Sequence, residues 1–63
     1  MAYVLQRTDD GAYVAPSGGA AAYTRLLQNA RTFATREAAE RDRCVENERV
    51  LSLEEAMRHG QAR

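Results

Sequence analysis

The expected fold is built around Ala30-Arg31-Thr32-Phe33-Ala34-Thr35-Arg36-Glu37-Ala38-Ala39-Glu40-Arg41, which has the pattern of a short strand followed directly by a helix. Phe33 is the only phenylalanine of the chain, and it stands where a strand would direct its side chain into a core. Thr35 suits an N-cap, because its hydroxyl can accept a hydrogen bond from an unpaired amide of the first helical turn. The residues that follow are good helix formers. We therefore predict a strand through Phe33 and a helix that begins at Arg36.

The segment before this stretch has the pattern of a β-hairpin over residues 2–15. Two runs of strand formers, Tyr3-Val4-Leu5 and Ala12-Tyr13-Val14, flank Thr8-Asp9-Asp10-Gly11. An Asp-Gly pair suits a tight turn, because glycine adopts a positive φ without steric cost. Alternation along the first run places Tyr3 and Leu5 on one face of the sheet and Val4 on the other.

The residues between the hairpin and the central stretch leave two alternatives open. Pro16-Ser17-Gly18-Gly19 ends the second strand and begins a loop. Beyond it, Tyr23, Leu26, Leu27 and Ala30 fit the apolar stripe of a short helix. We favour one or two helical turns over a flexible loop for residues 20–29.

The C-terminal third predicts one more strand and one more helix. Arg43-Cys44-Val45-Glu46-Asn47 interrupts the helical pattern, and asparagine is a typical turn residue. Glu48-Arg49-Val50-Leu51 follows as a strand. Ser52-Leu53-Glu54-Glu55 fits a capping box, in which the serine and the second glutamate each satisfy a backbone amide of the other. The last helix would then end near Gly60.

These elements predict a single small α+β domain over residues 1–63, in the order β-β-(short α)-β-α-β-α. We expect a three- or four-stranded, mainly antiparallel sheet with the helices packed on one face. A chain of this length buries only about 60% of the surface that it exposes when unfolded, so its core is small. The expected core residues are Leu5, Val14, Leu27, Phe33, Ala38, Val50, Leu53 and Met57.

The composition restricts the compartment and the means of stabilisation. A single cysteine, Cys44, leaves no intramolecular disulfide and too few ligands for a structural zinc site, so a partner or a second copy could supply stability instead. No apolar run approaches the ~20 residues of a membrane-spanning helix, and the N-terminus lacks a secretory pattern. We therefore expect a reduced, cytoplasmic setting and no membrane contact.

The residues with catalytic or metal-binding chemistry do not form a recognisable site. Cys44 and His59 belong to different predicted elements, without a nucleophile signature. The acids of the second half alternate with arginines, so a solvated charged face is favoured over a metal site; these acids are Glu37, Glu40, Asp42, Glu46 and Glu48. We expect no enzyme activity, no cofactor and no metal.

The charge is balanced overall but is unevenly distributed. Nine arginines and nine acids give a net charge of zero, and there is no lysine. No acid lies between Ala12 and Arg36, and that segment carries Arg25, Arg31 and Arg36. Arginine beside exposed tyrosine is enriched at protein interfaces and also stacks on nucleic-acid bases. We therefore predict that Tyr23 and these three arginines bind a partner, against the alternative of half-buried tyrosines and solvated arginines.

Several short motifs together resemble small proteins carried by bacteriophages and prophages: Tyr3-Val4-Leu5, Asp10-Gly11-Ala12-Tyr13-Val14, Tyr23-Thr24, Ala30-Arg31-Thr32-Phe33 and Thr35-Arg36-Glu37-Ala38-Ala39-Glu40. The resemblance covers nearly the whole chain, but its motifs describe packing, so no catalytic residue is carried over. It implies a phage accessory protein that binds a host protein, such as a CRISPR effector, another defence component, a polymerase or a regulator, and blocks or redirects it.

We therefore expect a protein–protein interaction module that modulates or inhibits a larger host protein, as a monomer or a homodimer, in the host cytoplasm. The alternative is a small nucleic-acid-binding regulator that uses the arginine and aromatic residues. Balanced charge disfavours this alternative, because acids over much of the surface would repel phosphate. A structural virion component is a third option that the sequence leaves open.

Overall fold

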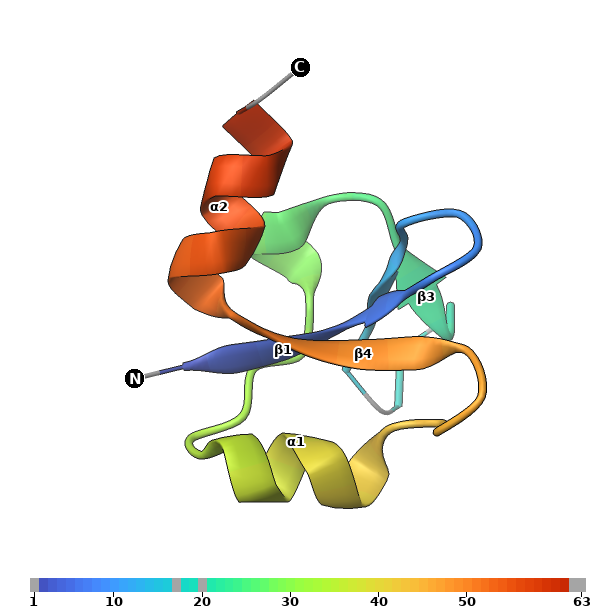
Figure 1. Cartoon of the computed structure of the whole chain (residues 1–63). Coiled ribbons are helices and arrows are strands. Elements are labelled where there is room, and N and C mark those ends of the chain that lie inside the picture. The colour runs from blue at the N-terminus through green and yellow to red at the C-terminus, as the bar shows by residue number, and fades with distance from the viewer. Residues whose placement is uncertain (1, 17, 20, 62–63) are drawn as a thin grey trace.

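The computed structural model describes residues 2–16, 18–19 and 21–61, with side chains described through residue 58. Four strands form one antiparallel sheet in the order β3-β2-β1-β4 (Figure 1). This confirms the predicted α+β class. None of the described helices is both long and apolar enough to cross a membrane. The elements are β1 (Tyr3–Arg7), β2 (Tyr13–Val14), β3 (Tyr23–Thr24), the 3-10 helix η1 (Leu27–Asn29), α1 (Arg36–Asp42), β4 (Glu48–Ser52) and α2 (Leu53–Gln61).

The predicted hairpin is formed by β1 and β2, with Gln6 opposite Tyr13. Gly11 has a φ of 77°, in the left-handed region that favours glycine. An Asp10 carboxylate oxygen accepts a hydrogen bond from the Ala12 N–H at 3.0 Å, which fixes the turn from within. The Asp-Gly pair therefore has the role that the sequence predicts for it.

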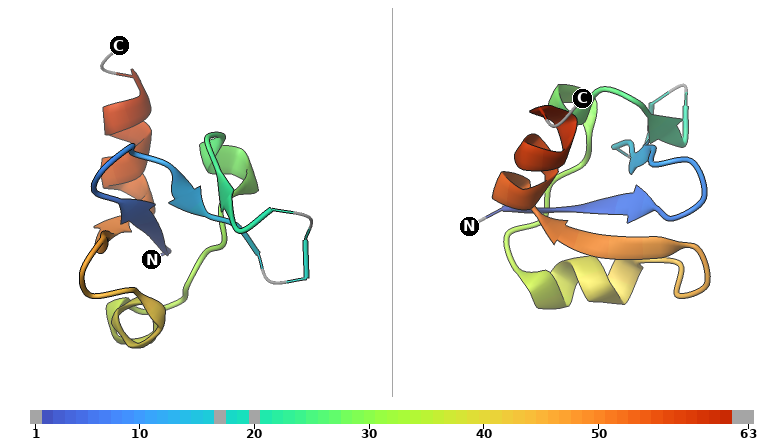
Figure 2. Two further views of the ribbon diagram at one scale, coloured as in Figure 1. Left: turned by 90° about the vertical axis from the view of Figure 1, so that its right-hand side faces the viewer. Right: turned by 45° about the horizontal axis from the view of Figure 1, so that its top comes forward.

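The two helices pack on opposite faces of the sheet, not on one face as we expected from the sequence (Figures 1 and 2). Val4 packs with Ala56 of α2, whereas its neighbour Leu5 packs with Ala39 of α1. Successive residues of a strand point to opposite faces, and both of these are large and apolar. Because β1 is an inner strand, each face needs its own cover, and one helix supplies it on each side.

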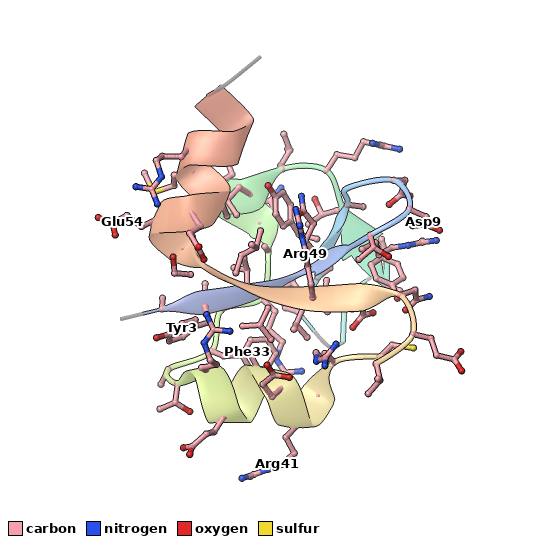
Figure 3. All side chains as sticks on the ribbon, in the orientation of Figure 1. Tyr3, Asp9, Phe33, Arg41, Arg49 and Glu54 are labelled. Atoms are coloured by element: carbon pink, nitrogen blue, oxygen red, sulfur yellow. The ribbon has the colours of Figure 1, made fainter. Side chains whose placement is uncertain are left out.

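The predicted strand through Phe33 is reduced to a single bridge. The Phe33 N–H donates to the Tyr3 carbonyl at 2.8 Å, and the Tyr3 N–H donates to the Phe33 carbonyl at 2.9 Å. Strand β2 pairs with the same edge of β1 at Gln6, so this segment reaches only the first residue of β1. Phe33 is nevertheless buried against the α1 side, as Figure 3 shows.

The sequence left residues 20–29 ambiguous, and the described part of this segment, residues 21–29, forms both a short strand and a helical turn. Tyr23 and Thr24 make the two-residue strand β3, which pairs with β2. Leu27–Asn29 forms η1, so a short helix exists but excludes Tyr23. The predicted short helix is therefore only partly confirmed, because Tyr23 and Thr24 pair with β2 as a strand instead of joining the helix.

The buried core of the structure differs from the core predicted from the sequence. Leu5 and Phe33 are buried as predicted, and Met57 is 49% exposed. The other predicted core residues are half-buried: Val14, Leu27, Ala38, Val50 and Leu53. The sequence prediction missed six buried apolar residues: Val4, Ala12, Tyr13, Ala39, Leu51 and Ala56. Most of these lie on the second covered face or at close helix–sheet contacts.

Both predicted N-caps are present. The Thr35 hydroxyl accepts a hydrogen bond from the Ala38 N–H at 3.1 Å. The Ser52 hydroxyl accepts from the Glu55 N–H at 3.1 Å, and a Glu55 carboxylate oxygen accepts from the Ser52 N–H at 3.0 Å. This hydrogen bond from the Ser52 backbone lowers the pKa of Glu55. Helix α2 continues past Gly60 to Gln61, one residue beyond the predicted stop.

Replacing Phe33 by alanine is expected to lower the free energy of unfolding by about 3–5 kcal/mol, because a cavity opens between the sheet and α1. That loss approaches the whole stability of a domain this small. Urea denaturation measures it, with Phe33→Leu as the control that keeps most of the buried volume. An unchanged unfolding midpoint for Phe33→Ala would show that this residue does not anchor the α1 side.

Replacing Ser52 by alanine is expected to cost about 1 kcal/mol, because the Glu55 amide loses its acceptor at the start of α2. Amide hydrogen exchange should show faster exchange at Ala56 and Met57 than in the wild type. Ser52→Thr keeps the hydroxyl and serves as the control. Equal protection in Ser52→Ala and wild type would contradict a capping role.

Candidate functional site

Tyr23, one of the predicted partner-binding residues, makes its side-chain contacts with other residues of the same chain. Its hydroxyl donates a hydrogen bond to the Glu48 carboxylate at 2.7 Å, and the Arg7 guanidinium lies 4.6 Å from the centre of its ring. The Tyr23 side chain is half-buried, and Glu48 is buried. The hydrogen bond to Glu48, together with burial, raises the pKa of Tyr23.

The Tyr23–Glu48 contact joins the two outermost strands of the sheet. In a flat sheet β3 and β4 would lie about 14 Å apart, because neighbouring strands are separated by nearly 5 Å. The two side chains can therefore meet only if the sheet twists and curls toward the α1 side. The other Glu48 oxygen accepts a hydrogen bond from the Cys44 N–H at 2.8 Å, so both oxygens of this buried carboxylate have partners.

Arg31 and Arg36 lie at opposite ends of α1. Arg31 forms an ion pair with Asp42, the last residue of the helix, at 3.0 Å, and its guanidinium lies 4.7 Å from the Phe33 ring centre. Arg36 is the first residue of α1, and its guanidinium lies 5.4 Å from the ring centre of Tyr3. A helix of seven residues is about 10 Å long, so the two arginines do not form one compact patch.

Of the predicted partner-binding residues, Arg25 has the fewest contacts within the chain. Its guanidinium makes one long hydrogen bond, 3.4 Å, to the backbone carbonyl of Asp10 in the hairpin turn. It is exposed, and it forms no ion pair with any described residue. The structure thus brings Tyr23 and Arg25 together on β3 and its continuation, and it separates Arg31 from Arg36 along α1.

An apolar groove lies between η1 and α2, a feature that the sequence analysis missed. Its volume is about 420 Å³, and Figure 2 shows the two elements that border it. The lining residues are Leu27, Gln28, Ala30, Thr32, Leu53 and Met57. Met57 is 49% exposed, and Leu26, next to η1, is 55% exposed. The available signal was the set Leu27, Leu53 and Met57, three groove residues that the sequence analysis assigns to the core.

The residues with metal-binding or nucleophilic chemistry form no cluster in the described part of the chain. No group of three histidine, cysteine or acidic side chains is close enough there to hold a metal ion. Cys44 is exposed, and the His59 side chain lies outside the described residues. Comparison with protein-family models, curated proteins and solved structures finds no significant match. Function is therefore inferred from the surface of the chain.

Replacing Tyr23 by phenylalanine is expected to lower stability at pH 7–8 by about 1–3 kcal/mol, because a buried Glu48 oxygen loses its donor. The pKa of Tyr23 is higher in the folded chain than in the unfolded chain. The stabilisation by its hydroxyl is thus complete below the unfolded value of about 10 and declines as the pH rises through the folded value. The stability difference between wild type and Tyr23→Phe should therefore shrink in alkali.

Urea denaturation between pH 7 and pH 11 measures this difference, and comparing wild type with Tyr23→Phe cancels the titration of the other tyrosines. Glu48→Gln supplies the partner for a double-mutant cycle. A constant stability difference across this range, or additive effects of the two substitutions, would show that the Tyr23–Glu48 hydrogen bond does not join β3 to β4 in solution.

Proposed function

We propose that this chain is a non-enzymatic protein–protein interaction module that modulates or inhibits a larger host protein in the cytoplasm. The resemblance to phage accessory proteins suggests the kind of target, such as a host-defence component or a regulator. The observation that supports an interaction role is the apolar groove between η1 and α2. Covering this aliphatic groove with apolar side chains of another protein would remove apolar surface from water, which favours association.

The shape of the groove favours a protein segment over a small molecule. Small-molecule sites typically bury 70–90% of the ligand's surface. Here the lining is itself open to solvent, since Met57 is half exposed and both Gln28 and Thr32 are exposed. A segment of a larger protein would cover the groove and its surroundings together.

The chemistry of the lining indicates what the partner presents. The centre is aliphatic, and Gln28 and Thr32 supply polar groups. An apolar centre with polar groups around it is the usual composition of a protein interface. Met57 adds a flexible side chain that adapts to the shape of the partner. We therefore assign the groove to apolar side chains of a larger protein, and the test below distinguishes this occupant from a second copy of the chain.

The geometry gives less support to the alternative role in nucleic-acid binding. The charge of Arg31 is neutralised by Asp42, and Arg36 lies at the other end of α1. Binding of single strands uses a continuous basic groove with stacking rings. The ring of Phe33 is buried and that of Tyr23 is half-buried, so neither presents an open stacking surface.

Replacing Met57 by glutamate is expected to weaken partner binding at least about tenfold, because a charge would be buried against apolar side chains at the centre of the interface. The matched control is Val45→Glu, which places the same charge on an apolar residue that is 74% exposed in the turn between α1 and β4. The partner is first identified by affinity capture from host lysate and mass spectrometry. Its affinity for the purified variants is then measured by calorimetry, with circular dichroism confirming that each variant is folded.

Equal affinity of Met57→Glu and Val45→Glu for the partner would exclude the groove as the contact surface. A wild-type dimer in light scattering that Met57→Glu dissociates would assign the groove to a second copy instead. A sub-micromolar complex with DNA or RNA at physiological salt, weakened by Arg25→Gln and Arg31→Gln, would favour the nucleic-acid alternative.

A further inference from the structure

Met57 places a thioether on the α2 wall of the groove, where it is open to water. The residue lines the groove together with Leu53, one helical turn earlier, and it is 49% exposed. An accessible thioether is readily oxidised to a sulfoxide. Met57 is the only methionine among the residues that the structure describes, so in that part of the chain this chemistry is confined to the groove.

The η1 side of the same groove carries two hydrogen-bond donors. Gln28 of η1 and Thr32 both line the groove, and both are exposed. Neither side chain forms a hydrogen bond with any described residue. The Gln28 amide and the Thr32 hydroxyl can each donate, but the thioether sulfur of Met57 is only a weak acceptor. The groove thus holds donors on one side and, in the reduced chain, no strong side-chain acceptor opposite them on Met57.

Oxidation of Met57 supplies such an acceptor. When a thioether reacts with hydrogen peroxide, the sulfur lone pair attacks one peroxide oxygen, the O–O bond breaks and an S–O bond forms. The other oxygen leaves as hydroxide and takes the proton of the transferred oxygen to become water, so the sulfur is oxidised and the peroxide is reduced. The product is a polar sulfoxide, and its oxygen accepts hydrogen bonds.

We propose that Met57 is a site of reversible oxidation that controls access to the groove. As the sulfoxide, its oxygen accepts hydrogen bonds from Gln28 and Thr32, which holds the side chain across the groove and replaces apolar lining by a polar group. Sulfoxide reductases restore the thioether and reopen the groove. The effect on a partner rests on the proposed interaction function, whereas the oxidation and the closure are properties of the chain alone.

The full chain is studied in a Cys44→Ser background, which removes the exposed thiol. It is treated with hydrogen peroxide and then with methionine sulfoxide reductases A and B, which act on one sulfoxide epimer each. Trypsin cleaves after arginine, so residues 50–58 report Met57 and residues 1–7 report Met1, and mass spectrometry detects one added oxygen in either peptide. Met57→Leu is the matched control, because it keeps an aliphatic side chain of similar size that peroxide does not oxidise.

We expect Met57 to be oxidised within about threefold of the rate of N-acetyl-methionine amide, because its thioether is accessible. The side-chain amide resonances of Gln28 in a nitrogen-15 spectrum should shift on oxidation and return after reduction, and they should not shift in treated Met57→Leu. The reductases should act about two- to tenfold faster on the oxidised Gln28→Ala, Thr32→Val double variant, because its sulfoxide has lost the hydrogen bonds that hold it.

The partner captured from host lysate tests the consequence for binding. Its affinity for the oxidised chain should fall at least about tenfold, because the apolar centre of the contact is lost. Treated and untreated Met57→Leu should bind it equally.

Three results on the chain alone would each overturn the proposal: resistance of Met57 to peroxide that oxidises N-acetyl-methionine amide, unchanged Gln28 resonances after oxidation, or equal rates of reduction in the double variant and the wild type. A partner that binds the oxidised and reduced chains equally would also overturn it, while a loss of binding in Met57→Glu would still assign the groove as the contact surface. Equal binding of Met57→Glu and Val45→Glu would instead remove the proposed contact surface and leave the oxidation to be decided by the measurements on the chain alone.

Discussion

The pairing of β1 with β4 is the constraint on which the rest of the structure depends. It joins residues 3–7 to residues 48–52, nearly the whole length of the chain apart, and it makes β1 an inner strand. Val4 and Leu5 are then almost fully buried on opposite faces, with exposed fractions of 0% and 1%. Two apolar faces need two covers, so α1 and α2 lie on either side of the sheet.

Several arginine side chains pack against aromatic rings of the domain instead of extending into solvent. Among the described side chains, the guanidinium groups of Arg7, Arg31 and Arg36 lie over aromatic rings. Such contacts add roughly 0.5–1 kcal/mol each at exposed sites, and the long side chains also shield the rings from water. Arginines that look available for a partner in the sequence are therefore partly committed to the domain itself. Arg25 is the least committed of them, because its exposed guanidinium makes a single long hydrogen bond, 3.4 Å, to the Asp10 carbonyl.

Some apolar side chains remain outside the small core and are open to water. The sheet buries its two inner faces, but α2 and η1 do not close over the aliphatic side chains between them, so a groove remains beside Met57. The outer edge of β4 is largely closed by hydrogen bonds from the adjacent turn and helix. The groove is the feature on which the proposed interaction rests.

Local features were predictable from the sequence because their partners lie within a few residues. The Asp10-Gly11 turn, the Thr35 cap and the Ser52–Glu55 capping box each satisfy backbone groups within a single turn, so residue type and spacing are sufficient. Alternation likewise separated Val4 from the residues on either side of it. Tertiary structure alone placed the helices on opposite faces, reduced the Phe33 strand to a bridge, joined Tyr23 to Glu48 and left the groove open. These outcomes depend on which strands compete for the two edges of β1, and pairing between distant segments is not encoded in any local pattern.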